Sequence, residues 1–261
     1  MRSPVPIEDT KLVRGVRVRN DPAREACFTI VHLHEDVPDD GGMGPEHRRQ
    51  RLHREYNQEV QTIEVAASCL SDFPDAPWKL RMELARQCWD EARHAKLIYL
   101  RLLANGGKKG DYPIANLDWS VVTMLDSMAA RLAIQHRTFE AGSLDIEQVA
   151  IPLFRNAGDD GTADVMDAIA ADEIHHVRFA NVWLKQMTDA DPRIVLKIAS
   201  AVAWLKKVVQ ATGGDAPHEI PTENAMRLLA GFSKAEVAEV EKLEKAFNAK
   251  LTAAGPPEQA A

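Results

Sequence analysis

Two related segments decide the fold, WDEARH at residues 89–94 and ADEIHH at residues 171–176. Both contain Asp-Glu-x-x-His, and both lie within stretches that have the hydrophobic spacing of a helix. A glutamate and a histidine three residues apart lie on the same helical face, one turn apart. One carboxylate and one imidazole can therefore bind the same metal ion from a single helix.

The polar groups of both segments face the expected core. Glu91 falls between Cys88 and Ala95 on the apolar stripe of its helix, and Glu173 follows Ile169 on the other. A buried carboxylate without a cation costs on the order of several kcal/mol, so two inward-facing copies indicate a metal site. The pattern predicts four ligands, which are Glu91, His94, Glu173 and His176.

Helical spacing continues on both sides of these segments. It predicts helices from Pro45 to the loop at residues 73–77, over about 78–104, over about 117–141 with an end at Gly142, and over about 162–187. A short helical piece at about 146–156, a fifth helix at about 193–211 and one or two final helices to about 251 complete the set. The fold class is therefore all-α, with an antiparallel four-helix core at 45–190, further helices at 191–253 and a disordered tail at 254–261.

Residues 1–44 differ from the rest and form a separate N-terminal extension. The stretch at 12–19 alternates apolar and basic residues, and the stretch at 28–33 is rich in β-branched residues. Residues 20–22 between them, Asn-Asp-Pro, favour a turn. We expect an extended arm or a short β-hairpin.

A dinuclear site needs one more carboxylate from each of the other two core helices. On the first helix, Glu59 lies between Tyr56 and Ile63 on the buried stripe, whereas Glu64 is about 100° away. Glu59 is also as far before the loop at 73–77 as Glu91 is after it, while Glu64 lies roughly 10 Å too close. Glu59 is the predicted ligand, and Glu64 is the alternative.

On the third helix the predicted ligand is Glu140. Its separation from Glu173 along the chain nearly equals that between Glu59 and Glu91. Glu140 lies off the apolar stripe of its own helix, however, and one extra residue, as in a π-bulge, would rotate it back by about 100°. His136 lies nearer the stripe and is the alternative, as an added ligand or a hydrogen-bonding neighbour.

These residues resemble the ligand set of the ferritin-like superfamily of carboxylate-bridged di-iron proteins. Asp90-Glu91-Ala92-Arg93-His94 matches the Asp-Glu-x-Arg-His form common in its oxygenases. The segments EVQTIEV at 59–65 and EAGSLD at 140–145 are similar to an uncharacterised ferritin-like family related to tRNA-hydroxylating enzymes. The resemblance covers about residues 45–190 and implies a four-helix bundle that holds two iron ions, with Fe/Mn or another metal pair as alternatives.

The resemblance also implies roles for neighbouring residues. Asp90 and Asp172 would accept the outer ring proton of a ligand histidine, and Arg93 would pair with one of them. Tyr56, one turn before Glu59, is a candidate neighbour of the site by position, although a packed core tyrosine is the favoured interpretation. No catalytic residue is predicted beyond the metal ligands.

The function expected from this site is O₂ activation by a di-iron oxidase or monooxygenase that acts on a small organic substrate. An electron donor and a homodimer are further possible partners. Alternatives are a ferroxidase or iron-handling protein, a tRNA-modifying hydroxylase, and a bundle that has lost its metal. The net charge of −7 argues against nucleic acid as a partner, although a basic run at residues 47–54 leaves it open. No apolar stretch approaches a membrane span, and residues 1–10 lack the core of a secretion signal, so we expect a cytoplasmic protein.

Overall fold

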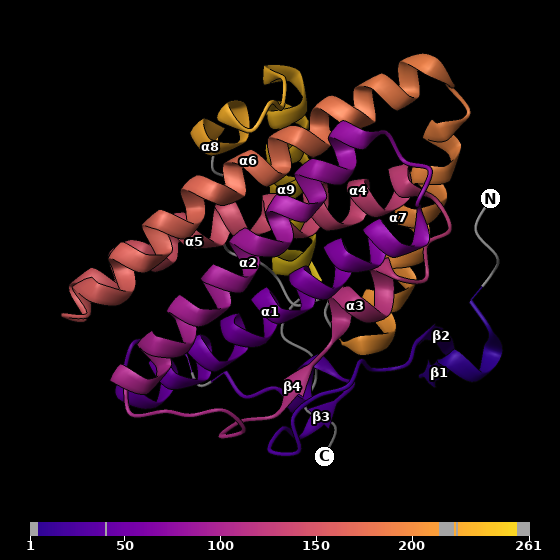
Figure 1. Ribbon diagram of the computed structural model, residues 1–261. Coiled ribbons are helices and arrows are strands. Elements are labelled where there is room, and N and C mark those ends of the chain that lie inside the picture. The colour runs from indigo at the N-terminus through magenta and orange to yellow at the C-terminus, as the bar shows by residue number, and fades with distance from the viewer. Residues whose placement is uncertain (1–4, 40, 214–221, 223, 255–261) are drawn as a thin grey trace.

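Helices α1 (Pro45–Asp72) and α2 (Trp78–Ala104) form an antiparallel pair in the computed structural model, which describes residues 5–39, 41–213, 222 and 224–254 (Figure 1). Leu52 near the start of α1 packs in one core cluster with Ile98 and Leu102 near the end of α2. Cys69 and Leu84 share another cluster at the opposite ends of the two helices. The predicted limits of both helices are confirmed. Pro45 occupies the first turn of α1, and the prolines of the connecting loop keep α1 from continuing into α2.

The third predicted helix is a longer and interrupted element. It consists of α3 (Leu117–Val122), α4 (Met128–Ile134), the π-helical segment η3 (Gln135–Glu140) and α5 (Ala141–Asn156). The predicted end at Gly142 was wrong, because Gly142 keeps an ordinary helical backbone and the helix continues to Asn156. A glycine inside a helix costs about 1 kcal/mol relative to alanine, which the packing of α5 on its neighbours overcomes.

A long helix, α6 (Asp160–Ala190), packs against both α2 and α5. The Asp159 side chain accepts a hydrogen bond from the backbone N–H of Thr162 and so caps its start. Helix α7 (Ile194–Thr212) ends at Gly213, which adopts the left-handed conformation with φ of 78°. Two further helices follow, α8 (Asn224–Leu229) and α9 (Lys234–Ala254). Of the predicted disordered tail at 254–261, Ala254 ends α9 and the other residues lie outside the described part of the chain.

The N-terminal extension contains a β-hairpin, which confirms one of the two predicted forms, an extended arm or a short β-hairpin. Strands β1 (Thr10–Val13) and β2 (Val16–Arg19) pair antiparallel around Arg14 and Gly15, which both have positive φ. The turn therefore lies inside the alternating stretch and not at residues 20–22, because two residues of positive φ suit the twist of a two-residue hairpin. Short 3-10 helices, η1 (Ile7–Asp9) and η2 (His34–Asp36), flank the N-terminal strands.

The extension is joined to the helices in two ways. Strand β3 (Ile30–Val31) pairs parallel with β4 (Ile114–Ala115), which lies just before α3. Val13 and Val18 of the hairpin are buried in a core cluster with residues of α3, α4 and α7. No helix among the described residues is long and apolar enough to cross a membrane.

Candidate metal centre

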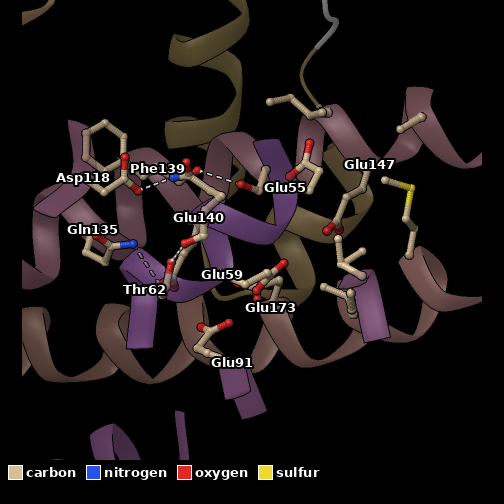
Figure 2. Close-up of a pocket in the computed structure, with 17 residues that line it drawn as sticks. Glu55, Glu59, Thr62, Glu91, Asp118, Gln135, Phe139, Glu140, Glu147 and Glu173 are labelled. Carbon is tan, nitrogen blue, oxygen red and sulfur yellow. Dashed lines mark hydrogen bonds between the residues drawn. The ribbon is translucent and has the colours of Figure 1, made fainter. Parts of the chain in front are cut away.

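The six predicted ligands come together in the middle of the helices. Glu59 comes from α1, Glu91 and His94 from α2, Glu140 from η3, and Glu173 and His176 from α6. The four carboxylates among them point toward one another in Figure 2. The donor atoms form two groups, within each of which all atoms lie within 4.8 Å of one another: Glu59, Glu91, His94 and Glu173 form the first group, and Glu140, Glu173 and His176 form the second.

The first group is centred on the His94 ring. Its Nδ1 lies 3.1 Å from Glu91 Oε2, 3.4 Å from Glu59 Oε2 and 3.5 Å from Glu173 Oε1. Three carboxylates from three helices therefore surround one imidazole nitrogen. Carboxylates and an imidazole in this arrangement suit iron, manganese or zinc.

The second group is centred on His176. Its Nδ1 lies 3.3 Å from Glu91 Oε1 and 3.5 Å from Glu173 Oε2. Glu91 and Glu173 thus each direct one oxygen toward His94 and the other toward His176. Two carboxylates shared between two donor groups are what a pair of neighbouring metal ions requires.

The π-helical segment brings Glu140 to the second group. A π-bulge adds one residue to a helical turn, which rotates the following side chains by about 100°. Glu140 is buried, and its Oε1 accepts a hydrogen bond of 2.7 Å from Gln87 Nε2. The helix irregularity predicted for Glu140 is thus present at residues 135–140.

His136, the alternative on this helix, has another partner. Its Nε2 lies 3.0 Å from Gln87 Oε1, and 3.9 Å from Glu140 Oε2. Burial lowers the pKa of His136 to about 3, so the ring is neutral and Nε2–H donates to Gln87. His136 therefore lies beside the cluster as a hydrogen-bonding neighbour, which is one of the two roles expected for it.

The two aspartates of the motifs bind the histidines crosswise. Asp90 Oδ2 lies 3.3 Å from His176 Nε2, and Asp172 Oδ2 lies 3.2 Å from His94 Nε2. Arg93 forms ion pairs with Asp90 at 3.2 Å and with Asp172 at 2.5 Å. The outer nitrogens are thus occupied, and the Nδ1 atoms of both rings point to the carboxylates.

Two other candidates lie elsewhere. Glu64 pairs with Arg24, whose Nη1 is 2.5 Å from its Oε1, so the alternative ligand on α1 is engaged outside the cluster. The ring of Tyr56 stacks with that of Phe28, lies tilted against that of Tyr99 and lies under the Lys109 ammonium. Tyr56 packs against the core cluster that contains Leu52 and Ile98, as expected for a packed core tyrosine, and it is not among the residues that line the cavity beside the carboxylates.

Burial and charge give the cluster unusual pKa values. Burial raises the pKa of Glu59 and Glu140 well above the usual range, and the neighbouring carboxylates raise it further. Burial alone would also raise the pKa of Glu173, but His176 and His94 outweigh it and lower this pKa to about 2. Burial opposes protonation of the two histidines, yet the carboxylates raise the pKa of both far above the usual value. The site favours positive charge, and a metal ion that replaces these protons binds more tightly as the pH rises.

Several buried atoms of the second group lack a hydrogen bond. Within the described part of the chain, His176 Nδ1, Glu140 Oε2 and Glu173 Oε2 make no hydrogen bond, although His176 Nδ1 lies 3.3–3.5 Å from two carboxylate oxygens. Buried polar atoms without partners cost about 1–3 kcal/mol each, so they are rare unless they bind a ligand or an ion. The residues present therefore fit a bound metal pair.

Sequence reasoning missed several polar residues around the cluster. Gln87 lies one turn before Glu91 on α2, and Glu147 lies two turns after Glu140. Each therefore shares a helical face with a predicted ligand, and this spacing could have identified both residues from the sequence. A cavity of about 50 Å³ beside the carboxylates is lined by Glu147 on one side and by Asp118 and Gln135 on the other (Figure 2). Burial raises the pKa of Glu147 well above its usual range.

Asp118 provides a test of the charge in this cavity. Burial raises its pKa to about 6 from 3.8, against hydrogen bonds from Gln58 and Gln135 that lower it. The folded protein therefore holds the Asp118 proton more tightly than the unfolded chain, so this residue's contribution to stability falls as the pH rises from about 4 to 6. Asp118→Asn is expected to increase the free energy of unfolding at about pH 7.5, on the order of 1–3 kcal/mol, with little effect at about pH 4.

Urea unfolding at both pH values measures this difference. Asp75→Asn, at an exposed loop position, is the matched control and should leave the free energy of unfolding unchanged at both. An equal effect of Asp118→Asn at the two pH values would show that Asp118 ionises normally.

Comparison with known proteins gives one match. A family model described as "Protein of unknown function (DUF455)" matches residues 7–238. No curated protein and no solved structure matches the chain significantly. The matched range includes the hairpin, all six clustered residues and the start of α9.

Proposed function

Since the chain belongs to the DUF455 family, a family of unknown function whose model covers the whole cluster, we propose its activity from the cluster itself. The protein is a non-haem di-iron oxidoreductase that uses O₂ to oxidise or oxygenate a small organic substrate. The metal ligands are the six clustered residues: Glu59, Glu91, His94, Glu140, Glu173 and His176.

The proposed architecture is a ferritin-like four-helix bundle. Its four members are α1, α2, the segment from α4 to α5 through η3, and α6. Each contributes one carboxylate to the cluster, and α2 and α6 add the histidines. This distribution of ligands is the one found in carboxylate-bridged di-iron bundles.

The observation that carries the proposal is the position of Glu91 and Glu173 between two histidines. One oxygen of each carboxylate lies within 3.1–3.5 Å of His94 Nδ1 and the other within 3.3–3.5 Å of His176 Nδ1. A single metal ion would need only one of these sets. The duplication supports a metal pair.

The protein's own residues would hold and protect this pair. When bound, two irons supply the electrons and the Lewis acidity that O₂ reduction needs. Asp90 and Asp172 keep a proton on the outer nitrogen of each histidine, which leaves Nδ1 free to bind metal. The buried positions of Glu91, His94 and His176 exclude bulk water from the ligands.

The proposed reaction needs an electron donor. Hydroxylation of a C–H bond consumes one O₂, two electrons and two protons, and yields an alcohol and one water. A partner protein or a small reductant would supply these two electrons for each turnover.

Anaerobic loading with Fe(II), followed by a measured addition of O₂, tests the proposal. We expect about two irons per chain, and we expect the total O₂ uptake to be limited by the amount of this bound pair. Iron that accumulates far beyond two per chain would instead support an iron-storage role. Loaded protein that takes up no O₂ would exclude an oxidase or oxygenase.

The aspartate that contacts His94 offers a second test, of metal affinity. Asp172→Asn keeps the shape of the side chain and removes the charge that orients the ring, so metal affinity is expected to fall about 10- to 100-fold. Competition with a fluorescent chelator for Co(II) measures this affinity. Asp167→Asn, at an exposed position on the same helix, should bind Co(II) as the unmodified protein does. Equal affinities in the two variants would show that Asp172 does not support a ligand.

A further inference from the structure

A second and much larger cavity lies next to the cluster. Its volume is about 560 Å³, within the range of small-molecule sites. It lies between the hairpin, α3, the η3–α5 segment and α7, and its wall is mainly hydrocarbon. The apolar side chains that form this wall include Val13, Leu117, Phe139, Ile146, Leu205 and Val208.

This large cavity and the small cavity beside the carboxylates share a wall. Phe139 and Ile146 line both of them. Helical spacing explains why, since Phe139, Gly142 and Ile146 follow one face of the η3–α5 segment. Glu140 and Glu147 lie on the adjacent face, toward the carboxylates (Figure 2). One helix therefore supplies a metal ligand to one side and the wall of the large cavity to the other.

The charged groups of the large cavity are compensated. The Lys11 ammonium forms an ion pair with Asp21, and Asp145 accepts a hydrogen bond of 2.9 Å from Arg227 Nε. His32 and His34 also line the cavity, and His32 Nδ1 lies 3.1 Å from Lys11 Nζ and 3.8 Å from Asp21 Oδ2. Among the described residues of the lining, no lysine, arginine, aspartate or glutamate is therefore left to neutralise a charged ligand. The cavity therefore favours an uncharged molecule over a fatty acid anion or a phosphate ester.

We propose that this cavity binds a neutral, mainly apolar organic molecule, and that this molecule is the substrate of the metal centre. The binding site stands on the cavity alone, whereas its role as a substrate site rests on the proposed function. Phe139 and Ile146 separate the bound molecule from the carboxylates and determine which of its atoms comes nearest to the metals.

Gly142 makes the cavity testable without disturbing the core. It lines the cavity, and a Cβ added there meets no atom within 4 Å. Its φ is not in the left-handed region, so other residues fit the backbone and improve helix propensity. Gly142→Phe therefore fills the cavity, and Gly142→Ala is the matched control that leaves it open.

The probe is 4-fluorobiphenyl, a neutral apolar molecule followed by fluorine NMR. We expect saturable binding to the unmodified protein, about tenfold weaker binding to Gly142→Phe, and unchanged binding to Gly142→Ala. Val209→Trp fills the cavity from α7 and should have the effect of Gly142→Phe. Exposed Val195 on the same helix provides the control Val195→Trp. The proposal would be overturned if the unmodified protein did not bind the probe, or if both filled variants bound it as tightly as the unmodified protein does.

Two further measurements separate this inference from the proposed function. Glu91→Ala should bind 4-fluorobiphenyl normally even where it has lost its metal. In protein loaded with Co(II), the paramagnetic ion should shorten the relaxation time of the bound fluorine, because only the shared wall lies between them. A cobalt-loaded protein that binds the probe without this effect would rule out the cavity as a substrate site while leaving the metal centre intact.

Discussion

Glu91→Ala is expected to reduce the metal content from about two ions per chain to nearly none. Glu91 lies 3.1 Å from His94 Nδ1 and 3.3 Å from His176 Nδ1, so its loss removes a ligand from both halves of the centre. The remaining carboxylates cannot replace it, since each comes from a different helix. Metal analysis after anaerobic loading with Fe(II) measures the change.

Three other glutamate variants make the result specific. Glu59 contacts only the His94 group, and Glu140 belongs only to the His176 group, so Glu59→Ala and Glu140→Ala should each retain about one ion. Glu64→Ala, on the same helix as Glu59 but paired with Arg24, should retain both ions. Full metal content in Glu91→Ala would refute the assignment of the centre.

Arg131→Leu is expected to have the largest effect on stability, a loss of about 3 kcal/mol in the free energy of unfolding. Arg131 is fully buried, and its guanidinium lies over the Phe73 ring. It forms an ion pair of 2.6 Å with Asp72 and donates to the carbonyl of Leu125 in the break between α3 and α4. Leucine fills the space but satisfies none of these acceptors. Urea unfolding followed by circular dichroism measures the loss.

An exposed arginine provides the comparison for this change. Arg155 on α5 forms a surface ion pair with Asp164 at 2.9 Å. Exposed ion pairs contribute about 0–1 kcal/mol, so Arg155→Leu should hardly alter the free energy of unfolding. Similar losses in the two variants would mean that Arg131 does not hold the break together.

The sequence contained the features that locate the cluster because they are periodic. Glu91 and His94, and likewise Glu173 and His176, share a helical face, and that relation holds before any tertiary contact forms. The same argument of face and depth selected Glu59 over Glu64, and the structure places Glu59 in the cluster. A π-bulge before Glu140 was also predicted, because Glu140 lies off the apolar stripe of a regular helix and could face the core only after such a rotation.

Other features depend on contacts that periodicity does not encode. The turn of the hairpin was expected at residues 20–22, yet Gly15 divides the alternating stretch into two strands that the α7 side chains bury. The helix was expected to end at Gly142, although glycine only weakens a helix and does not end it. The core packing of Tyr56 agrees with the favoured interpretation, but its contact with Phe28 of the extension was not predicted, because no local pattern determines the position of the extension.

The crosswise contacts of Asp90 and Asp172 have a consequence for how α2 and α6 lie along each other. Each histidine is held by the aspartate of the opposite helix, and Arg93 joins both aspartates. A slip of one residue between the helices, about 1.5 Å along their axis, would break both contacts at once. The axial register of the two helices is therefore fixed at the same level as the carboxylates. The ends of the two helices can then move without a change in the distance between the two histidines.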